Sequence, residues 1–527
     1  MGNETKANEI SGRTVNVKRN IVYGLMQFIV SHVFPFIVRT ILIYRFGVDY
    51  IGLNSLFASI LSVLSLMDLG FGTAVVYSMY KPVAEGDTAQ ICAYLSYYRK
   101  MYRLVGVAIL AIGLLLMPFL TSFIKDQALP GELNLYVCYI LFLLDAVISY
   151  LFYGYMTAIP TAYQRMDILS RVNMGMILLK CVMQSLILLS FSSFYLYLLS
   201  IPLLTIVRNL VIACVVRKKY PALKCNGEIS FEQKNNLKRK VYGVFINKMT
   251  NISRNSIDSL CISFYIGLAM TGMYNNYYYV MAGALSLSVM VCISMLPSVG
   301  NSIATESRAK NYYDMRLFDF IFMSIAGWTT TCLLCLCQPF IQTWVGEKMM
   351  LGTSVVVGIS FYFYILVSGS IQWLYHQGAG LWWECRYIML GEAVANIVLN
   401  FVLCKIMGIL GIILATILTV FATNCLFCPR LLFKLYFKNA KLQEYWSDHA
   451  CYALTMLLTA GFSWFVCERG FPISMVAERQ VVDCILCIVG RTAICLALSV
   501  LVFWFIWHRS ERYLKAVGWI KKIANFL

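Results

Sequence analysis

The stretch from Leu237 to Asn275, LKRKVYGVFINKMTNISRNSIDSLCISFYIGLAMTGMYN, is apolar and long enough to cross a membrane, yet it contains cations, an acid and several asparagines. In a helix, positions i, i+4, i+7 and i+11 form one polar stripe, which here consists of Asn247, Asn251, Arg254 and Asp258, flanked by Lys248 and Asn255. Because ionised groups are costly in lipid, we expect this stripe to face protein or water.

The beginning of this stretch repeats a pattern from the beginning of the chain. The segments VKRNIVYG and LKRKVYG start at Val17 and Leu237. At the same distance from each start, a G-x4-G motif is followed by an asparagine: Gly47, Gly52 and Asn54 in the first copy, and Gly267, Gly272 and Asn275 in the second. Two copies of one opening hairpin predict two related halves of one molecule.

The composition identifies the class of protein. With 527 residues, of which 60% are hydrophobic and 13% charged, and a mean hydropathy of +0.72, the chain is too apolar for a soluble protein. It is predicted to be an all-α integral membrane protein. In a soluble domain the net charge of +18 would suggest nucleic acid. Here most cations lie in short loops beside apolar runs, so no nucleic-acid partner is expected.

Fourteen apolar runs are predicted to be transmembrane helices. Their approximate ranges are 20–44, 51–80, 104–124, 134–160, 172–192, 194–216, 241–266, 273–300, 317–341, 353–376, 386–406, 408–432, 450–467 and 484–507. When the connections are numbered alternately, the set that contains both termini holds most of the Lys and Arg residues. The positive-inside rule therefore predicts a multi-pass membrane protein with both termini in the cytoplasm.

The longest connection between spans is also the most basic, and it separates the sixth span from the seventh. It predicts two parallel six-helix lobes, followed by two C-terminal helices. The predicted parts are an N-terminal lobe at 1–216, a basic cytoplasmic linker at 217–240, a C-terminal lobe at 241–435, two extra transmembrane helices at 450–508 and a basic cytoplasmic tail at 509–527.

Ten charged residues of the predicted spans are candidates for a role inside the membrane. Four of them are near helix ends and could extend their charge to the membrane surface: Lys180, Lys248, Glu392 and Arg491. Six are deeper or belong to the polar stripe: Arg39, Asp68, Asp145, Arg208, Arg254 and Asp258. A cavity role for Arg254 and a structural ion pair with Asp258 are compatible. Asp145 is expected to pair with Lys180 or Arg208.

Two further segments have open interpretations. Asp68 lies in LSLMDLGFGTAVV, where Gly70 and Gly72 permit either a gating hinge or close helix packing. Asp68 and Asp258 are candidate residues for coupling transport to an ion gradient. The run from Tyr274 to Tyr279, which includes Asn275, is either an aromatic belt at the membrane surface or a surface for stacking on sugars.

Enzymatic and metal-binding motifs are not evident in the sequence. The pairs Cys335-x-Cys337 and Cys425-x2-Cys428 have ligand-like spacing, but no neighbouring His or Cys cluster completes a zinc site, so neither a metal nor a cofactor is expected. The sequence contains no phosphate-binding P-loop and only four histidines. We therefore expect a protein that is not an enzyme and does not itself hydrolyse nucleotides.

Several motifs together resemble those of the polysaccharide flippases (Wzx-type, O-antigen and teichoic-like) of the multidrug/oligosaccharidyl-lipid/polysaccharide exporter superfamily, here the MOP superfamily. The similar features are the G-x4-G-L-N entry to the second span, DLGFGTAVVY running to Tyr80-Lys81-Pro82, the basic link before the seventh span, MYNNYYYVMAG in the eighth, and EAVANIVLNFVLCKIMGILGIILATI in the eleventh and twelfth. The resemblance extends over nearly the whole chain.

The resemblance implies alternating-access transport of an undecaprenyl-diphosphate-linked oligosaccharide from the inner to the outer leaflet. It also implies a cavity lined largely by spans one, two, seven and eight, in which cations hold the lipid diphosphate. Arg39 and Arg254 match those cations by location. The other predicted substrate-binding residues are Asn247, Asn251, Lys248, Arg208 and Asn275, because amides suit sugar hydroxyls and cations suit phosphate. The expected partners are this lipid-linked substrate, membrane lipids, and a polysaccharide polymerase with glycosyltransferases.

Two other classes of function remain as alternatives. A cation-coupled drug antiporter of the same superfamily shares the architecture, but a cationic substrate favours an excess of acids, and the ten residues singled out above comprise six bases and four acids. A membrane glycan polymerase or acyltransferase needs a catalytic outer loop or a buried histidine, and neither is evident.

Overall fold

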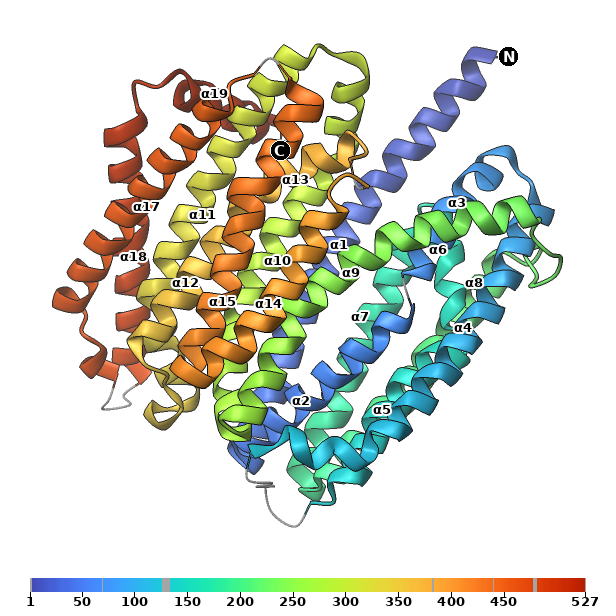
Figure 1. The fold of residues 1–527 in the computed structure, drawn as a ribbon, viewed down its shortest axis with the longest axis horizontal. Helices are drawn as coiled ribbons and strands as arrows, with labels where there is room; N and C mark the ends of the chain where they lie inside the picture. Colours follow the sequence, from blue (N-terminus) through green and yellow to red (C-terminus); the bar gives the residue numbers. More distant parts are fainter. Residues whose placement is uncertain are drawn as a thin grey trace. The chain divides into compact units, whose positions relative to one another are not determined.

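The computed structural model describes residues 2–68, 70–125, 133–381, 383–438, 440–476 and 481–526, and every regular element within these ranges is a helix (Figure 1). The all-α fold class predicted from composition is therefore confirmed. Contacts divide the chain into two compact units, unit 1 (Met1–Ala269) and unit 2 (Met270–Leu527).

Among the described residues, 11 helices are long and apolar enough to cross a membrane, or 12 if the bent pair Leu135–Leu151 and Gly154–Ala162 forms one span. Two predicted runs are outside this set. The run at 51–80 is divided among three shorter elements, and the run at 241–266 lies in a helix rich in polar residues. The protein is thus a multi-pass membrane protein, while the number of fourteen spans stays a prediction.

Unit 1 begins with a long helix and ends with the helix that contains the polar stripe. Its elements are α1 (Gly2–Phe46), α2 (Val48–Leu64), η1 (Ser65–Asp68), α3 (Phe71–Glu85), α4 (Thr88–Leu116), η2 (Met117–Phe123), α5 (Leu135–Leu151), η4 (Gly154–Thr157), α6 (Ala158–Ala162), α7 (Met166–Leu186), η5 (Ile187–Phe191), α8 (Phe194–Lys219) and α9 (Phe231–Tyr265). Helix α5 lies between α4 and α8, and α1 packs along α7 (Figure 1).

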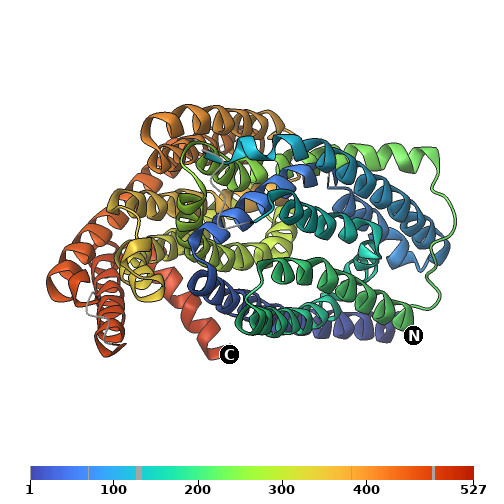
Figure 2. The same ribbon diagram turned by 90° about the horizontal axis from the view of Figure 1, so that it is seen from below.

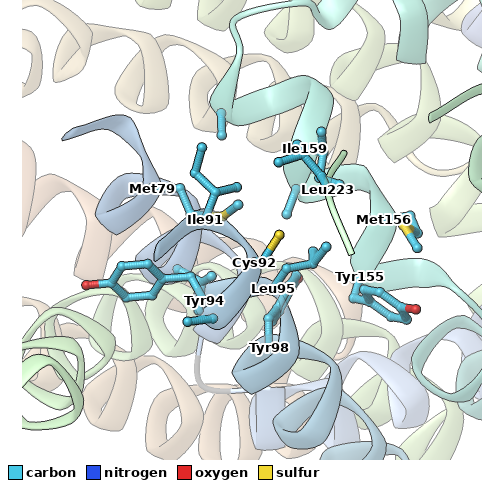
Figure 3. Packing of buried hydrophobic residues seen from close by; sticks show 14 of the residues in the cluster. Met79, Ile91, Cys92, Tyr94, Leu95, Tyr98, Tyr155, Met156, Ile159 and Leu223 are labelled. Atoms are coloured by element: carbon cyan, nitrogen blue, oxygen red, sulfur yellow. The ribbon is translucent and has the colours of Figure 1, made fainter. Parts of the chain in front are cut away.

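A buried cluster of apolar side chains holds one end of unit 1 together (Figure 3). Its members come from α3, α4, η4, α6, α7, α8 and α9, and from the segment between α8 and α9. Met79, Ile91, Leu95 and Ile159 in this cluster are each completely buried. Burying side chains of this kind contributes about 1.5–3 kcal/mol each relative to exposure to water. The cluster thereby fixes α3 and α4 relative to each other.

The repeated opening motif adopts the same local conformation in both copies. Gly47 is the single residue between α1 and α2 and has φ +102°, and Gly267, directly before α10, has φ +125°. Side chains disfavour this left-handed region, so glycine is the residue that permits both corners. At Gly52, a Cβ atom would overlap the carbonyl oxygen of Leu268, so only glycine allows this approach of the backbones.

Helix α9 packs against α2 and α3, which places it in unit 1 by its contacts. The sequence pattern instead assigns 241–435 to a C-terminal lobe and 217–240 to a linker. That division concerns how the two repeats are related, and it remains a prediction.

Unit 2 is organised around α11. Its elements are α10 (Leu268–Thr305), α11 (Arg308–Val345), η6 (Glu347–Met349), α12 (Thr353–Ser368), α13 (Ser370–Gly378), α14 (Arg386–Met407), α15 (Ile409–Phe421), η7 (Ala422–Phe427), α16 (Cys428–Leu432), η8 (Phe433–Phe437), α17 (Leu442–Gly470), η9 (Ile473–Val476), α18 (Val481–Trp507) and α19 (Glu511–Phe526), with α10 starting at the end of unit 1. Helix α11 contacts α12, α17 and α18, and the red-coloured pair α17 and α18 lies together in Figure 2.

Uncharged polar contacts join α14 to α15 in the interior of unit 2. The side-chain amide of Asn396 donates to Thr416 Oγ1 at 3.1 Å, and that of Asn400 donates to Asn396 Oδ1 at 3.3 Å. A Cβ atom at Gly411 would overlap the carbonyl oxygen of Leu403, so glycine permits the tight turn between these helices. Asn396 and Asn400 belong to the EAVANIVLNF part of the motif quoted above. They therefore help to pack two helices.

Candidate functional site

The second predicted span is interrupted in its interior. Helix α2 ends at Leu64, a single 3-10 turn follows from Ser65 to Asp68, and Gly70 adopts the left-handed conformation with φ +71° before α3 begins. Such an interruption leaves backbone carbonyl groups without partners in the helix, and inside a membrane these groups must find other donors.

Lys248 of α9 supplies that donor. Its Nζ atom donates to the carbonyl oxygen of Ser65 at 2.6 Å and lies 3.3 Å from Asp68 Oδ2. The Lys248 side chain is 26% exposed and that of Asp68 is 15% exposed. The structure thus corrects one sequence-based interpretation, because Lys248 does not extend to the membrane surface but binds the break in the second span.

The two glycines of the DLGFG segment have different roles. Gly70 forms the break itself, because its left-handed φ ends the preceding turn. Gly72 allows close packing, since a Cβ atom there would lie 2.5 Å from the hydroxyl of Tyr98. The sequence left a hinge and tight packing as alternatives, and the structure shows a break at the first glycine and tight packing at the second.

Tyrosines surround Asp68 on its other side. The phenols of Tyr98, Tyr102 and Tyr150 are near enough for the charge of Asp68 to act on them. The rings of Tyr98 and Tyr102 have centroids 4.5 Å apart, and those of Tyr102 and Tyr150 are 4.8 Å apart. Asp68 Oδ1 is buried and has no hydrogen-bond partner among the described residues. This oxygen is therefore available to a proton or to a ligand.

A second polar group lies beyond these tyrosines in unit 1. Asp145 of α5 accepts a hydrogen bond from Thr205 of α8, and Arg208, one turn further along α8, donates to Asn173 Oδ1 of α7 at 2.9 Å. The charge of Asp145 also acts on Arg208 and on Lys180. Instead of the expected direct ion pair, the described contacts show hydrogen bonds to uncharged groups that hold acid and base close together.

The remaining predicted residues occupy different surroundings. Arg39 of α1 is partly buried, and its charge acts on Tyr197 of α8. Within α9, Asp258 is buried, Arg254 is half-buried and Asn251 is exposed.

Asn247 and Asn275 are the other two asparagines predicted to bind substrate. The Asn247 side chain lies outside the described part of the chain. Asn275 donates to the carbonyl oxygen of Thr271 in its own helix at 2.8 Å. The convergence of Arg39 and Arg254 on one ligand stays a prediction.

Several residues of the site were not identified from sequence patterns. Those that contact or surround the predicted charges are Ser65, Tyr98, Tyr102, Asn173 and Thr205. Tyr98 and Tyr102 lie one helical turn apart, and this i, i+4 spacing of two aromatic residues was the available signal. Asn173 and Thr205 are uncharged and gave no comparable signal.

Unit 2 holds two groups of side chains that could bind a metal ion. One consists of Cys335, Cys467 and Cys495, and the other of His376, Cys385 and Cys428. The expectation of no metal site rested on the lack of neighbouring ligands along the sequence. Tertiary contacts bring such ligands together, and Cys335 and Cys428, one from each pair with ligand-like spacing, each have two potential partners.

Several solved structures of transporters are similar to this chain in fold. A structure of the lipid II flippase MurJ in an inward closed conformation covers 93% of this chain and 98% of its own, with a TM-score of 0.65 at 11% identity. An inward-facing multidrug resistance MATE family transporter of the MOP superfamily covers 77% of this chain and 95% of its own, with a TM-score of 0.63 at 11% identity.

A MOP superfamily transporter from Pyrococcus furiosus, whose description notes a reversed polarity of its binding pocket, has a TM-score of 0.55 at 11% identity over 81% of this chain and 96% of its own. No family model matches the sequence, and no curated protein matches it. At these identities the similarity establishes the fold, which is that of MOP superfamily transporters.

Proposed function

We propose that this protein is a flippase that moves an undecaprenyl-diphosphate-linked oligosaccharide from the inner to the outer leaflet of a bacterial cytoplasmic membrane by alternating access. The observation that carries the proposal is the excess of cations inside unit 1. Its predicted spans contain five bases and three acids: Arg39, Lys180, Arg208, Lys248 and Arg254, and Asp68, Asp145 and Asp258.

This excess suits a phosphate-containing headgroup. A diphosphate carries about two negative charges, and guanidinium groups can replace its hydration shell with paired, charge-assisted hydrogen bonds. Arg39 of α1 and Arg254 of α9 are the proposed ligands of the diphosphate, because each lies in the first helix of its predicted repeat. Exposed Asn251, on the same helix as Arg254, is proposed to contact the sugar.

The fold supports a lipid substrate by analogy, since one structure with this fold is a lipid II flippase. Other structures with this fold are multidrug transporters, so a cation-coupled drug antiporter is the second candidate. The charges in unit 1 favour the flippase, because a cationic drug would meet net repulsion there. A flippase of this kind would act between glycosyltransferases that build the glycan and a polymerase that uses it.

Purified protein in lipid vesicles provides the test. Fluorescent undecaprenyl-diphosphate-linked oligosaccharide is placed in both leaflets, and the fraction that a membrane-impermeant quencher can reach is followed over time. We expect protein-dependent exchange between leaflets that a neutral glycolipid of the same chain length does not show. Lys100→Ala, which removes an exposed contact to Glu228, serves as the matched control and should exchange at the wild-type rate.

The antiporter alternative predicts the opposite pattern. Uptake of a cationic dye driven by a proton or sodium gradient, without movement of the lipid-linked glycan in the same vesicles, would overturn the flippase proposal. Exchange of the neutral glycolipid at the same rate would show scrambling that is not specific for the diphosphate, and it would overturn the proposal as well.

A further inference from the structure

Four cysteines from three helices meet in the interior of unit 2, and together they are named here the thiol cluster: Cys332 and Cys335 of α11, Cys467 of α17 and Cys495 of α18. Cys335, Cys467 and Cys495 are completely buried, and Cys332 packs against them. Their convergence is a tertiary feature, because α11 is far in sequence from α17 and α18.

The sulfur atoms face one another. The Sγ atoms of Cys335, Cys467 and Cys495 all lie within 4.8 Å of one another, and the thiol of Cys495 is within hydrogen-bonding reach of the other three. Cysteines that serve only as small packing residues have no need to direct their sulfurs to a common point. Three converging sulfurs, with Cys332 beside them as a potential fourth ligand, form a donor set of the kind that binds a metal ion in tetrahedral thiolate sites.

The spacing suits a single ion. With Zn–S bonds of about 2.3 Å, a tetrahedral site separates its sulfurs by about 3.8 Å, so the observed sulfurs need to move inward only slightly. The Cys332-x2-Cys335 spacing is the C-x2-C pattern of many zinc sites, and on a helix it places both sulfurs on the same side.

A buried cation lies next to the cluster. The side chain of Arg491 is 1% exposed, and its guanidinium donates to the carbonyl oxygens of Cys335 and Phe471, each at 2.9 Å, and to Glu468 Oε1 at 2.8 Å. The Arg491 guanidinium is thus bound by groups of unit 2, and its extension to the membrane surface stays a prediction. Bound thiolates would bring more negative charge than one divalent ion neutralises, and a neighbouring guanidinium offsets part of that excess.

We propose that the thiol cluster is a structural binding site for one thiophilic metal ion, with Zn²⁺ as the preferred occupant. Each ligating thiol loses its proton to solvent as its sulfur–metal bond forms, so neither an oxidant nor a reductant is needed. The ion would join α17 and α18 to α11 at the same level as Arg491. The two C-terminal helices would then be fastened to unit 2 by a metal site as well as by an ion pair.

The proposal is tested on the full-length protein, expressed with supplemental zinc and purified in detergent with a peptide tag that contains no histidine. Elemental analysis should find about one zinc per chain in the wild type. The double variant Cys467→Ser/Cys495→Ser should lose this zinc. Cys337→Ser is the matched control, because Cys337 is a buried cysteine of the same helix outside the cluster, and it should retain the zinc.

The other group of potential ligands requires its own control. His376, Cys385 and Cys428 could also hold zinc, so the content of the Cys385→Ser variant is measured in parallel. Retention of zinc in Cys385→Ser supports the thiol cluster. Loss of all zinc in Cys385→Ser, together with retention in Cys467→Ser/Cys495→Ser, would place the ion elsewhere and overturn the proposal.

Two measurements on the wild type avoid any dependence on how well the variants fold. Replacement of zinc by Co²⁺ should produce intense thiolate-to-metal absorption in the near ultraviolet, and copper or iron in place of zinc would refute the preferred occupant. Mass spectrometry without reduction should show all four cysteines as free thiols after removal of the metal. A disulfide among them in freshly purified protein, or a protein that binds no thiophilic ion at all, would overturn the proposal.

Discussion

Unit 1 and unit 2 place their charged residues differently. Among the ten charged residues singled out in the predicted spans, all except Glu392 and Arg491 belong to unit 1. In unit 2, a described network of ion pairs lies instead near helix ends. Arg316 of α11 contacts Glu444 at 2.9 Å and Asp448 at 2.6 Å, and Arg512 of α19 contacts Asp448 at 2.9 Å.

The difference indicates a division of labour. A charged side chain in the middle of a bilayer costs about 3 kcal/mol on insertion scales, so a protein retains several of them only where they do something that uncharged residues cannot. Apart from the buried residues Asp319, Glu392 and Arg491, unit 2 fills its described interior with amides, aromatic rings and thiols, and it uses charges to fasten the ends of its helices. We therefore expect substitutions of charged residues to impair transport in unit 1 and stability in unit 2.

The largest effect is expected for the two arginines proposed to bind the diphosphate. Arg39→Ala and Arg254→Ala should each remove about 1.5–3 kcal/mol of charged hydrogen bonding. Exchange of the lipid-linked oligosaccharide in vesicles should then fall about ten- to a hundredfold for each variant at matched protein amounts, since 1.4 kcal/mol corresponds to a factor of ten. Replacement by lysine should restore only part of the rate, because lysine cannot bind phosphate in a bidentate manner.

A structural role of Arg254 gives a different result. If this arginine only neutralises Asp258, the double variant Arg254→Ala/Asp258→Ala should recover the exchange that Arg254→Ala loses. Wild-type exchange in the Arg39→Ala/Arg254→Ala double variant would exclude both arginines as ligands of the diphosphate.

The second effect concerns the ion pair at the break in the second span. Lys248→Met leaves Asp68 without its cation and should lower the unfolding temperature of the purified protein and reduce exchange, because an uncompensated buried charge costs about 3–5 kcal/mol. Combining Lys248→Met with Asp68→Asn should recover most of the stability. If Asp68 also couples transport to an ion gradient, the recovered protein should no longer respond to a protonophore or to sodium; an unchanged response would assign coupling to another residue.

A smaller effect separates the two glycines near Asp68. Gly70→Ala forces a side chain into the left-handed region at a cost of about 1–2 kcal/mol and should slow exchange. Gly72→Ala meets the hydroxyl of Tyr98, so adding Tyr98→Phe should relieve that variant and leave Gly70→Ala unchanged. Gly175→Ala, where a Cβ atom meets open space, is the control. Rescue of both variants by Tyr98→Phe would contradict the separate roles.

The smallest effect on transport is expected in unit 2. Arg316→Ala removes contacts to Glu444 and Asp448 and should lower stability by about 1 kcal/mol, seen as a lower unfolding temperature, with exchange close to that of wild type. Lys310→Ala, at an exposed pair with Glu306, should change neither property. An exchange defect in Arg316→Ala as large as that of Arg39→Ala would contradict the division of labour between the units.

The sequence was sufficient to predict the fold class, because apolar runs of membrane length are a strong signal. It also predicted the repeated corner at Gly47 and Gly267, since left-handed connectors favour glycine. The partner of Lys248 was not predictable, because it depends on an interruption about 180 residues earlier in the chain. The bend of 57° between Leu135–Leu151 and Gly154–Ala162 was missed for a similar reason, since the apolar run continues through it.

The cysteines are a clearer example of tertiary contacts that could not be predicted from the sequence. Counting along the chain paired Cys335 with Cys337, whereas the helices of unit 2 bring Cys335 to Cys467 and Cys495. The spacing of residues within one helix can be read from the sequence. Contacts among three helices cannot, because they are determined by side-chain packing over the whole unit.

The corner at Gly47 limits how unit 1 can move. A connector of one residue offers only two backbone torsions, and Gly52 presses α2 against the backbone at Leu268. Both features restrict motion between α1 and α2, so we expect these two helices to move together as one rigid body. Asp68 lies four residues after the end of α2, and Gly70 follows it. At this break Lys248, instead of continuous helical hydrogen bonds, connects the two parts of the span. We therefore expect a conformational cycle to bend the second span at this break, after Lys248 has released its contacts to Ser65 and Asp68.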